Sequence, residues 1–252
     1  MNRSRDLQFE SVANIRDLGG ILSKDGRKIK DRLLIRSSEL SRLDEEEAKI
    51  LYEDIGVKTV FDFRSRYEAM RAPDVIGEGV RLIPNEIATN ESFGVRRDEE
   101  TMKELDRIMK QLRESDDEEL ALEFMRHFYR SFAISDFSLR QYGKFLHYVL
   151  DHEDPVLWHC SMGKDRCGVG TVLVLELLGV DREDIIEDYL YTNEIYGIKD
   201  TGYASGFEIA DRSYIAAFYD EVFKAYGDLA SFFEQMNISE RDRVLFRERA
   251  LV

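Results

Sequence analysis

The stretch WHCSMGKDRCG (residues 158–168) lies between two apolar runs and constrains the fold more than any other feature. Residues 155–159 before it predict a buried strand, and residues 169–178 after it predict a buried helix that ends at Gly179. Such a strand–loop–helix unit directs several backbone N–H groups and the positive end of the helix dipole into the loop. The sequence therefore predicts a site for an oxyanion such as phosphate or sulfate in this loop.

The side chains of the loop suit chemistry on a phosphate ester. Cys160 supplies a thiol, and a helix N-terminus together with Arg166 favours the nucleophilic thiolate form. Arg166 offers a planar fork for two phosphate oxygens, and Gly163 lets the backbone turn without a Cβ penalty. A thiolate that faces a phosphoryl group predicts phosphomonoester hydrolysis through a phosphocysteine intermediate.

Elsewhere, short apolar runs alternate with amphipathic stretches, which is typical of α/β proteins. Strands are predicted over residues 33–35, 57–63, 80–84 and 156–159. Helices are predicted from Ser41, which resembles an N-cap, and over residues 98–110, 118–132, 137–150, 168–178, 182–191, 207–226, 228–235 and 240–250, the last capped by Ser239. The 252 residues fit one domain. Within it, the charged residues 85–119 predict a solvated helical excursion, with a mobile lid as a compatible interpretation.

The composition excludes several classes of partner. The formal net charge of −15 repels nucleic acid and anionic membrane surfaces. There is no apolar run of 18 residues, so we expect no transmembrane helix, and the first 20 residues lack the apolar core of a secretory signal, so we expect a cytoplasmic protein. The two cysteines do not make a disulfide framework.

Residues 159–166, which read HCSMGKDR, resemble the phosphate loop of the Cys-x5-Arg protein tyrosine phosphatase superfamily. More narrowly, the chain is similar to a bacterial tyrosine phosphatase family whose loop reads HCxxGKDR. The segments NIRDLGG (14–20), LLIRSSEL (33–40), VFDFRSRYE (60–68) and FKAYGDLASFFEQMNIS (223–239) also match, so the resemblance covers nearly the whole chain. It implies a mostly parallel sheet flanked by helices and no metal or other cofactor. The implied substrates are phosphotyrosine, phosphoserine or phosphothreonine in proteins, or phosphoinositides.

The resemblance also implies roles for the loop residues. Cys160 is the nucleophile, Arg166 the phosphate clamp and Asp165 the general acid that protonates the leaving oxygen. Lys164 would contact the additional negative charge of inositol-type substrates. The phosphate would be bound by Ser161, Met162, Gly163, Lys164, Asp165 and Arg166.

Several charged residues outside the loop are expected to support it. Asp62 ends a predicted strand at the edge where ligands bind in α/β sheets, and we expect it to pair with Arg64 or Arg166 rather than transfer a proton. His159 is expected to orient the loop as a buried hydrogen-bond partner. Metal ligation by His159 is disfavoured because no second histidine or carboxylate lies at ligand spacing.

Other charged residues leave alternatives open. Arg16 and Asp17 are expected to form a structural ion pair. Arg64, Arg66, Arg96 and Arg97 would favour a phosphoinositide if their segments faced the loop, but exposed charge without a ligand is the ordinary interpretation.

Cys167 stands where the superfamily usually has Ser or Thr, whose hydroxyl assists release of the cysteine sulfur. Because a thiol is a weaker donor, the intermediate would break down more slowly. Alternatively, Cys167 could trap an oxidised Cys160 as a disulfide, or it could simply be a small buried residue. Cys167 therefore keeps open a second function, a phospho-ligand binding module with impaired turnover. A rhodanese-type sulfurtransferase, which also has a catalytic cysteine loop, is a third, although Arg166 and the preceding Lys-Asp suit phosphate better.

Overall fold

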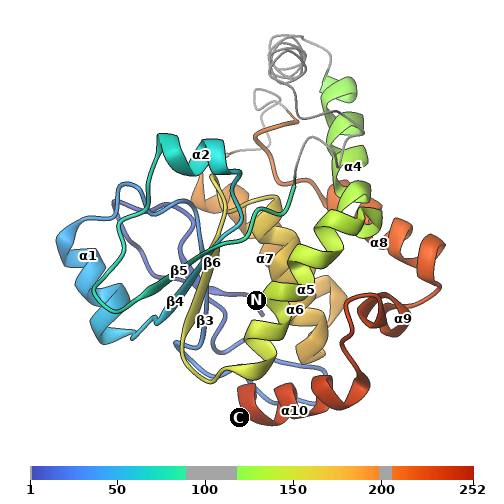
Figure 1. Cartoon of the computed structure of the whole chain (residues 1–252). Helices are drawn as coiled ribbons and strands as arrows, with labels where there is room; N and C mark the ends of the chain where they lie inside the picture. Colours follow the sequence, from blue (N-terminus) through green and yellow to red (C-terminus); the bar gives the residue numbers. More distant parts are fainter. Residues whose placement is uncertain (1, 89–117, 199–205) are drawn as a thin grey trace.

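The computed structural model describes residues 2–88, 118–198 and 206–252, and strands from these residues form one six-stranded sheet (Figure 1). The strand order is β1-β2-β3-β6-β4-β5. Four strands run parallel: β3 (Leu34–Ser37), β6 (Val156–His159), β4 (Thr59–Asp62) and β5 (Arg81–Pro84). Two short strands, β1 (Arg5–Asp6) and β2 (Arg16–Asp17), add an antiparallel edge. The predicted mostly parallel α/β architecture is confirmed; the two short edge strands and the short helix α2 were not predicted.

Side chains alternate between the two faces of the sheet and build a separate core on each. Phe61 of β4 and Trp158 of β6 belong to the larger core, which α4–α10 complete. Val60 and Leu157, their immediate neighbours in sequence, belong to the smaller core beneath α1 and η1. The central strands are thus buried on both sides, as expected for parallel strands covered by helices.

The helices lie on both sides of the sheet, with α1 and η1 on one side and α5–α7 on the other (Figure 1). Their bounds are α1 (Glu45–Lys49), the π-helical turn η1 (Ile50–Asp54), α2 (Arg66–Arg71), α4 (Glu118–Ile134), α5 (Asp136–Asp151), α6 (Arg166–Leu178), α7 (Arg182–Ile195), α8 (Arg212–Tyr226), α9 (Leu229–Glu234) and α10 (Glu240–Ala250). None of the described helices is long and apolar enough to cross a bilayer.

Two helix starts differ from the prediction because another residue caps the helix. The prediction of Ser41 as an N-cap was wrong: Asp44 accepts the Glu47 amide at 2.9 Å, and Ser41 donates to Glu39 instead. Helix α8 begins at Arg212 rather than at residue 207, because Asp211 caps it. The expected Ser239 cap of α10 is confirmed, with a full capping box. The helix predicted over residues 98–110, and nearly all of the 85–119 excursion, lie outside the described residues.

The register of the sheet places the loop after β6 at the edge where ligands bind. His159 pairs with Ser37 of β3 on one side and with Asp62 of β4 on the other, and β6 is the strand inserted between them. The carboxyl ends of all three strands therefore meet where the chain leaves β6 at Cys160. In open α/β sheets this is the position of the ligand crevice.

Candidate active site

The predicted strand–loop–helix unit is present, since β6 ends at His159 and α6 begins at Arg166. Cys160 lies at the start of the connecting loop and is only 2% exposed. Asp165 is the N-cap of α6, but its side chain does not cap the helix. The carboxylate is therefore free to make contacts across the loop.

The carbonyl groups of residues 161–163 are all held from outside the loop. Their donors are the Glu39 amide (3.2 Å to Ser161 O), Asn14 Nδ2 (3.0 Å to Met162 O and 3.1 Å to Gly163 O), the Tyr196 hydroxyl (2.8 Å to Met162 O) and Arg36 Nη2 (2.5 Å to Gly163 O). In a trans peptide the N–H of the next residue points opposite to the carbonyl. The amides of residues 162–164 therefore point into the loop, where they form an anion-binding concavity next to the α6 N-terminus.

Gly163 is required by the close approach of this loop to β3. Its φ is +66°, and a Cβ there would lie 2.5 Å from the carbonyl oxygen of Ser37. Both the backbone conformation and the space exclude any side chain. The prediction made for this glycine from the sequence is confirmed.

Arg166 is fixed by Glu68 of α2, a residue that the sequence interpretation missed. Its Nη1 and Nη2 each donate to one carboxylate oxygen of Glu68 at 2.7 Å, and Ser161 Oγ donates to the same carboxylate at 2.6 Å. Glu68 is itself held by a capping box with Ser65 at the start of α2. This bidentate pair uses one side of the guanidinium and leaves donors for a phosphate.

The two partners shift each other's pKa. Burial alone would lower the pKa of Arg166, but the hydrogen bonds and charge of Glu68 outweigh it and raise that pKa well above its usual value. For Glu68, burial favours the neutral acid, yet the Arg166 guanidinium holds the pKa of that carboxyl far below its usual range. Both shifts favour the charged forms, so the pair is ionised at neutral pH.

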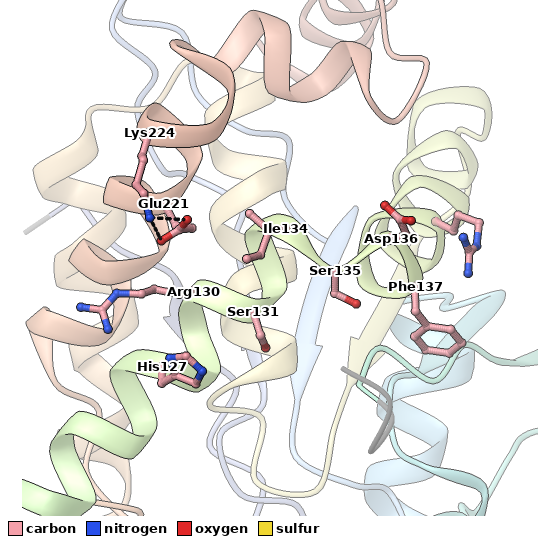
Figure 2. A pocket seen from close by; sticks show the side chains of 10 residues that line it. His127, Arg130, Ser131, Ile134, Ser135, Asp136, Phe137, Glu221 and Lys224 are labelled. Atoms are coloured by element: carbon pink, nitrogen blue, oxygen red, sulfur yellow. Dashed lines mark hydrogen bonds and ion pairs between the residues drawn. The ribbon is translucent and has the colours of Figure 1, made fainter. Parts of the chain in front are cut away.

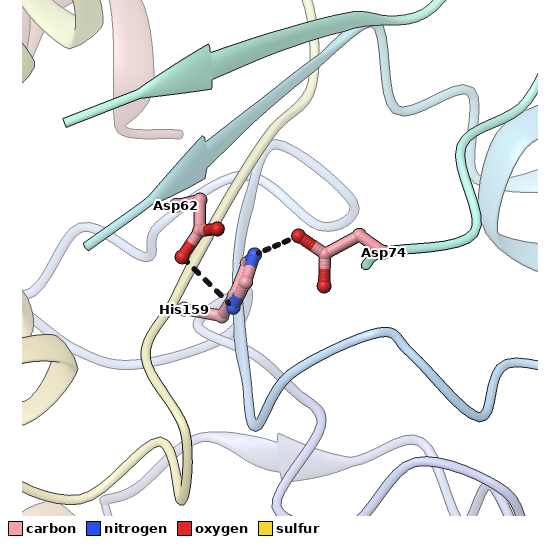
Figure 3. Close-up of side chains that lie close together, drawn as sticks. All are labelled: Asp62, Asp74 and His159. Carbon is pink, nitrogen blue, oxygen red and sulfur yellow. Dashed lines mark ion pairs between the residues drawn. The ribbon is translucent and has the colours of Figure 1, made fainter. Parts of the chain in front are cut away.

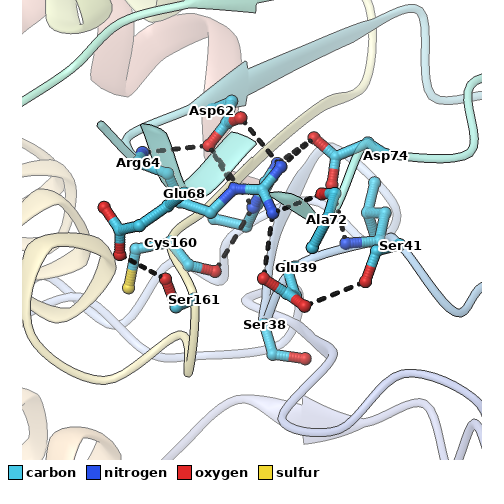
Figure 4. Close-up of polar contacts among 12 residues, drawn as sticks. Ser38, Glu39, Ser41, Asp62, Arg64, Glu68, Ala72, Asp74, Cys160 and Ser161 are labelled. Atoms are coloured by element: carbon cyan, nitrogen blue, oxygen red, sulfur yellow. Dashed lines mark hydrogen bonds and ion pairs between the residues drawn. The ribbon is translucent and has the colours of Figure 1, made fainter. Parts of the chain in front are cut away.

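Arg64 is a buried hub beside the loop and is not exposed to ligand (Figure 4). Its Nε and Nη2 donate to Asp62 at 2.9 Å each, and Nη2 also donates to Asp74 at 2.8 Å. Its Nη1 donates to Glu39 at 2.9 Å and to the Ala72 carbonyl at 2.8 Å. Of the two expected partners of Asp62, the structure places Arg64, not Arg166, against it. Arg64 thereby joins the end of β4 to the segment whose amide holds the loop.

His159 is fully buried between two carboxylates (Figure 3). Its Nδ1 lies 3.3 Å from the Cys160 carbonyl and 3.9 Å from Asp62 Oδ1, and its Nε2 lies 3.2 Å from Asp74 Oδ2. The fold thus brings carboxylates to the histidine that spacing in the sequence did not reveal, and their ligand atoms lie within 4.8 Å of one another. A metal does not fit this cluster well, because the carboxylates face opposite ring nitrogens and both already bind the Arg64 guanidinium.

Lys164 is not where the resemblance implied. Its side chain is fully buried, and its ammonium donates to the carbonyls of Phe207 at 2.6 Å and Ile209 at 2.9 Å. It also lies 3.4 Å from Asp165 Oδ1. The ammonium is satisfied by the protein interior, and no part of it is exposed to meet a substrate.

Asp165 lies at the mouth of the site with one oxygen bound to a buried phenol. Its Oδ1 accepts from the Tyr129 hydroxyl at 2.8 Å, and that hydroxyl lies 2.7 Å from the hydroxyl of Tyr189. The Asp165 side chain is 21% exposed, whereas Tyr129 is completely buried. The carboxyl group therefore connects the interior with the open side of the loop.

Cys167 is buried in the first turn of α6, where its Sγ lies 3.5 Å from the Trp158 carbonyl. Burial, only partly offset by Arg36, raises the pKa of the Cys167 thiol to about 11. Both cysteines are free thiols. The surroundings of Cys167 thus favour its interpretation as a small buried residue.

The predicted pair of Arg16 with Asp17 is wrong, because neighbours on a strand point to opposite faces. Arg16 donates instead to the Asp188 carbonyl at 2.7 Å, and its Nη1 lies 3.5 Å from Asp188 Oδ1. Arg36 lies 3.4 Å from the other oxygen of the same carboxylate. Asp17 pairs with Arg5 at 2.6 Å. Two buried arginines therefore share one buried aspartate directly behind the loop.

Of the other candidate cations, Arg66 alone lies in the described part of the chain. Arg66 is exposed on α2, and Arg96 and Arg97 lie outside the described residues. A hollow of 920 Å³ exists elsewhere, between α4, α5 and α8 (Figure 2). Its lining includes Arg130, Arg140 and Lys224 but no residue of the 159–167 loop, so it is separate from the oxyanion site.

Comparison with known proteins identifies a family and several relatives of this chain. The model described as "Tyrosine phosphatase family" matches residues 7–252. The chain is 35% identical over 170 residues to "Triple specificity protein phosphatase PtpB" of Mycobacterium tuberculosis, which covers 64% of this chain and 61% of that protein. It is 28% identical over 191 residues to a Cupriavidus necator relative that is also named for the tyrosine-protein phosphatases, which covers 75% of this chain and 63% of the relative.

A third relative, "Tyrosine-protein phosphatase" of Nostoc commune, is 26% identical over 156 residues, which covers 62% of this chain and 46% of the relative. The chain spans about three fifths of the length of the Mycobacterium and Cupriavidus proteins.

Proposed function

Since the chain belongs to the tyrosine phosphatase family, we propose that it hydrolyses phosphomonoesters, phosphotyrosine in proteins first among them, through a phosphocysteine at Cys160. The observation that carries the proposal is the loop itself: a buried cysteine at the carboxyl end of the central strand, inward amides held by outside donors, and Arg166 fixed by Glu68.

The reaction proceeds in two steps, formation of the phosphocysteine and its hydrolysis. The Cys160 thiolate attacks phosphorus while the bond to the ester oxygen breaks, and the Asp165 carboxyl gives its proton to the departing oxygen. Water then attacks the phosphocysteine, Asp165 takes a proton from that water, and the Cys160 thiolate leaves. Arg166 and the loop amides bind the charge that develops on the equatorial oxygens in both steps.

The surroundings of the cations support phosphotyrosine over a phosphoinositide. Three described residues were offered from the sequence as contacts for extra phosphates. Lys164 and Arg64 are fully buried and bound to protein acceptors, and Arg66 is exposed on α2. The name of the mycobacterial relative assigns triple specificity to that protein. For this chain we propose one phosphoryl group per substrate as the main requirement.

The test is to trap and identify the intermediate. Wild-type protein mixed rapidly with an aryl phosphate and quenched in acid is expected to carry one phosphate on Cys160 by mass spectrometry, and vanadate is expected to block turnover. Cys160→Ser is expected to bind a phosphotyrosine peptide, in competition with vanadate, but to release no phosphate from it. Wild-type protein that binds phosphopeptide without releasing phosphate would instead establish the binding-module alternative, and a persulfide formed from thiosulfate would establish the sulfurtransferase.

A further inference from the structure

Two helices bring hydroxyl groups to Asp165, which precedes a third helix. Tyr129 comes from α4, Tyr189 from α7, and Asp165 stands at the start of α6. The Tyr129 hydroxyl is 2.8 Å from Asp165 Oδ1 and 2.7 Å from the Tyr189 hydroxyl. Tyr129 is completely buried and Tyr189 is 1% exposed, so water does not compete for these contacts.

The direction of the hydrogen bonds follows from the number of protons. Tyr129 has a single hydroxyl proton and donates it to Asp165 Oδ1, which can accept it also when the acid proton is on Oδ2. The Tyr129 oxygen therefore accepts from Tyr189 while it donates to Asp165. Burial, strengthened by the charge of Asp165, raises the pKa of both phenols well above the usual value, so both keep their protons. Hydrogen bonds linked in this way strengthen one another in a buried site.

These contacts fix which carboxyl oxygen serves the substrate. Oδ1 is bound by Tyr129 and lies 3.4 Å from the Lys164 ammonium, and both of these neighbours are fully buried. With Oδ1 held toward the interior by these two neighbours, Oδ2 is the oxygen of this partly exposed carboxyl that is left to serve a substrate.

We propose that Tyr129, supported by Tyr189, is the positioning residue that holds Asp165 so that Oδ2 delivers the proton to the leaving oxygen. The inference rests on the function proposed above and adds to it the device that orients the acid. It predicts that the loss of activity depends on the leaving group, because a misplaced acid slows the reaction only when the leaving oxygen needs a proton. An ester of an acidic phenol leaves without help, whereas tyrosine, whose phenol has a pKa of about 10, does not.

The experiment compares two substrates in Tyr129→Phe, which removes only the hydroxyl. On a phosphotyrosine peptide, kcat/KM is expected to fall about tenfold, a part of the roughly 10²–10⁴-fold that general acid catalysis supplies. On difluoromethylumbelliferyl phosphate, whose phenol is strongly acidic, kcat/KM is expected to change less than about twofold. Asp165→Asn should show the same selectivity with a larger loss.

Tyr219→Phe is the matched control, because the Tyr219 hydroxyl also donates to a buried carboxylate, Glu176, at 2.6 Å, but away from the loop. It is expected to lower the unfolding temperature without altering the ratio of the two activities. Tyr189→Phe provides a second variant and is expected to shift the ratio about threefold in the same direction.

Equal losses on both substrates in Tyr129→Phe and no change of the ratio in Tyr189→Phe would overturn the positioning role. That result differs from failure of the proposed function, in which the wild-type protein would release no phosphate from either substrate.

Discussion

The contact between Glu68 and Arg166 can be tested quantitatively, through both stability and activity. Glu68→Gln keeps the size of the side chain but removes its charge and one of its two acceptors. The lost charge-assisted hydrogen bond is worth about 1.5–3 kcal/mol when fully buried. Because the Glu68 side chain is 34% exposed, solvent screening reduces the expected loss of unfolding free energy to about 1–2 kcal/mol.

The same free energy should appear in the kinetics, since in the proposed mechanism the guanidinium that Glu68 orients binds the transition state. A loss of about 1–2 kcal/mol corresponds to about 5–30-fold in kcat/KM, and vanadate should bind more weakly by a similar factor. The unfolding temperature should fall by about 2–8 °C for a chain of this size. The assays are phosphate release from a phosphotyrosine peptide, vanadate inhibition, and thermal unfolding of the same preparations.

A matched control is available on the surface, where Glu183 makes the same two-pronged contact with Arg212 at 2.6 and 2.9 Å. Glu183→Gln should leave kcat/KM and vanadate inhibition unchanged. If Glu68→Gln is folded and its kcat/KM and vanadate affinity stay within about twofold of wild type, the reasoning about Arg166 is refuted.

The pH dependence of the Glu68 contribution has a definite sign. A carboxylate with a depressed native pKa stabilises the folded state above its unfolded pKa, about 4.3 for glutamate, and loses that contribution as the pH falls below it toward the native pKa. The difference in unfolding free energy between wild type and Glu68→Gln should therefore be constant above about pH 5.5 and shrink below about pH 4. A difference that grows as the pH falls would contradict the ion pair.

Three further changes test neighbouring parts of the loop. Lys164→Met should destabilise the fold and lower turnover equally on a phosphotyrosine peptide and a soluble phosphoinositide, because the ammonium binds the interior; a loss confined to the phosphoinositide would place it on the substrate. With a pKa of about 11, the Cys167 thiol is ionised only about one part in 3,000 at pH 7.5. Peroxide should therefore oxidise Cys160 to the sulfinic acid without forming a disulfide. A trapped disulfide between Cys160 and Cys167 would contradict this. Gly163→Ala should lose nearly all activity, since its Cβ would meet Ser37 O at 2.5 Å; retention of normal turnover on an aryl phosphate would show that the loop can rearrange.

The parts of the site that could be predicted are local in sequence. β6, the loop and α6 are consecutive, so apolar runs and one glycine sufficed to place Cys160 and Arg166 at the carboxyl edge of the sheet. Glu68 escaped because it reaches Arg166 across 98 positions from a helix of only six residues, and neither separation nor periodicity marks such a contact. The capping pattern Ser65–Glu68 was the one local signal, and it announces a helix start rather than a partner for Arg166.

The direction in which a long side chain points could not be predicted from the sequence either. Lys164 follows a glycine in a loop, where solvent exposure is the ordinary expectation, yet the carbonyls that bind its ammonium belong to a segment some 45 positions later. Arg16 likewise passes over its neighbour Asp17 for a carboxylate on α7. Chain topology, not composition, decides which opposite charge a buried cation meets.

Two guanidinium groups share the single carboxylate of Asp188 behind the loop, which leaves one unit of positive charge in excess there. Burial and the nearby Arg36 lower the pKa of Arg16 to about 10, so Arg16 remains protonated at neutral pH. Dissolved ions cannot gather around a charge enclosed in the protein as they do around one in water. Although the chain has a formal charge of −15, this buried positive charge attracts an anion to the loop at Gly163. The attraction should persist at ionic strengths that screen an exposed basic patch.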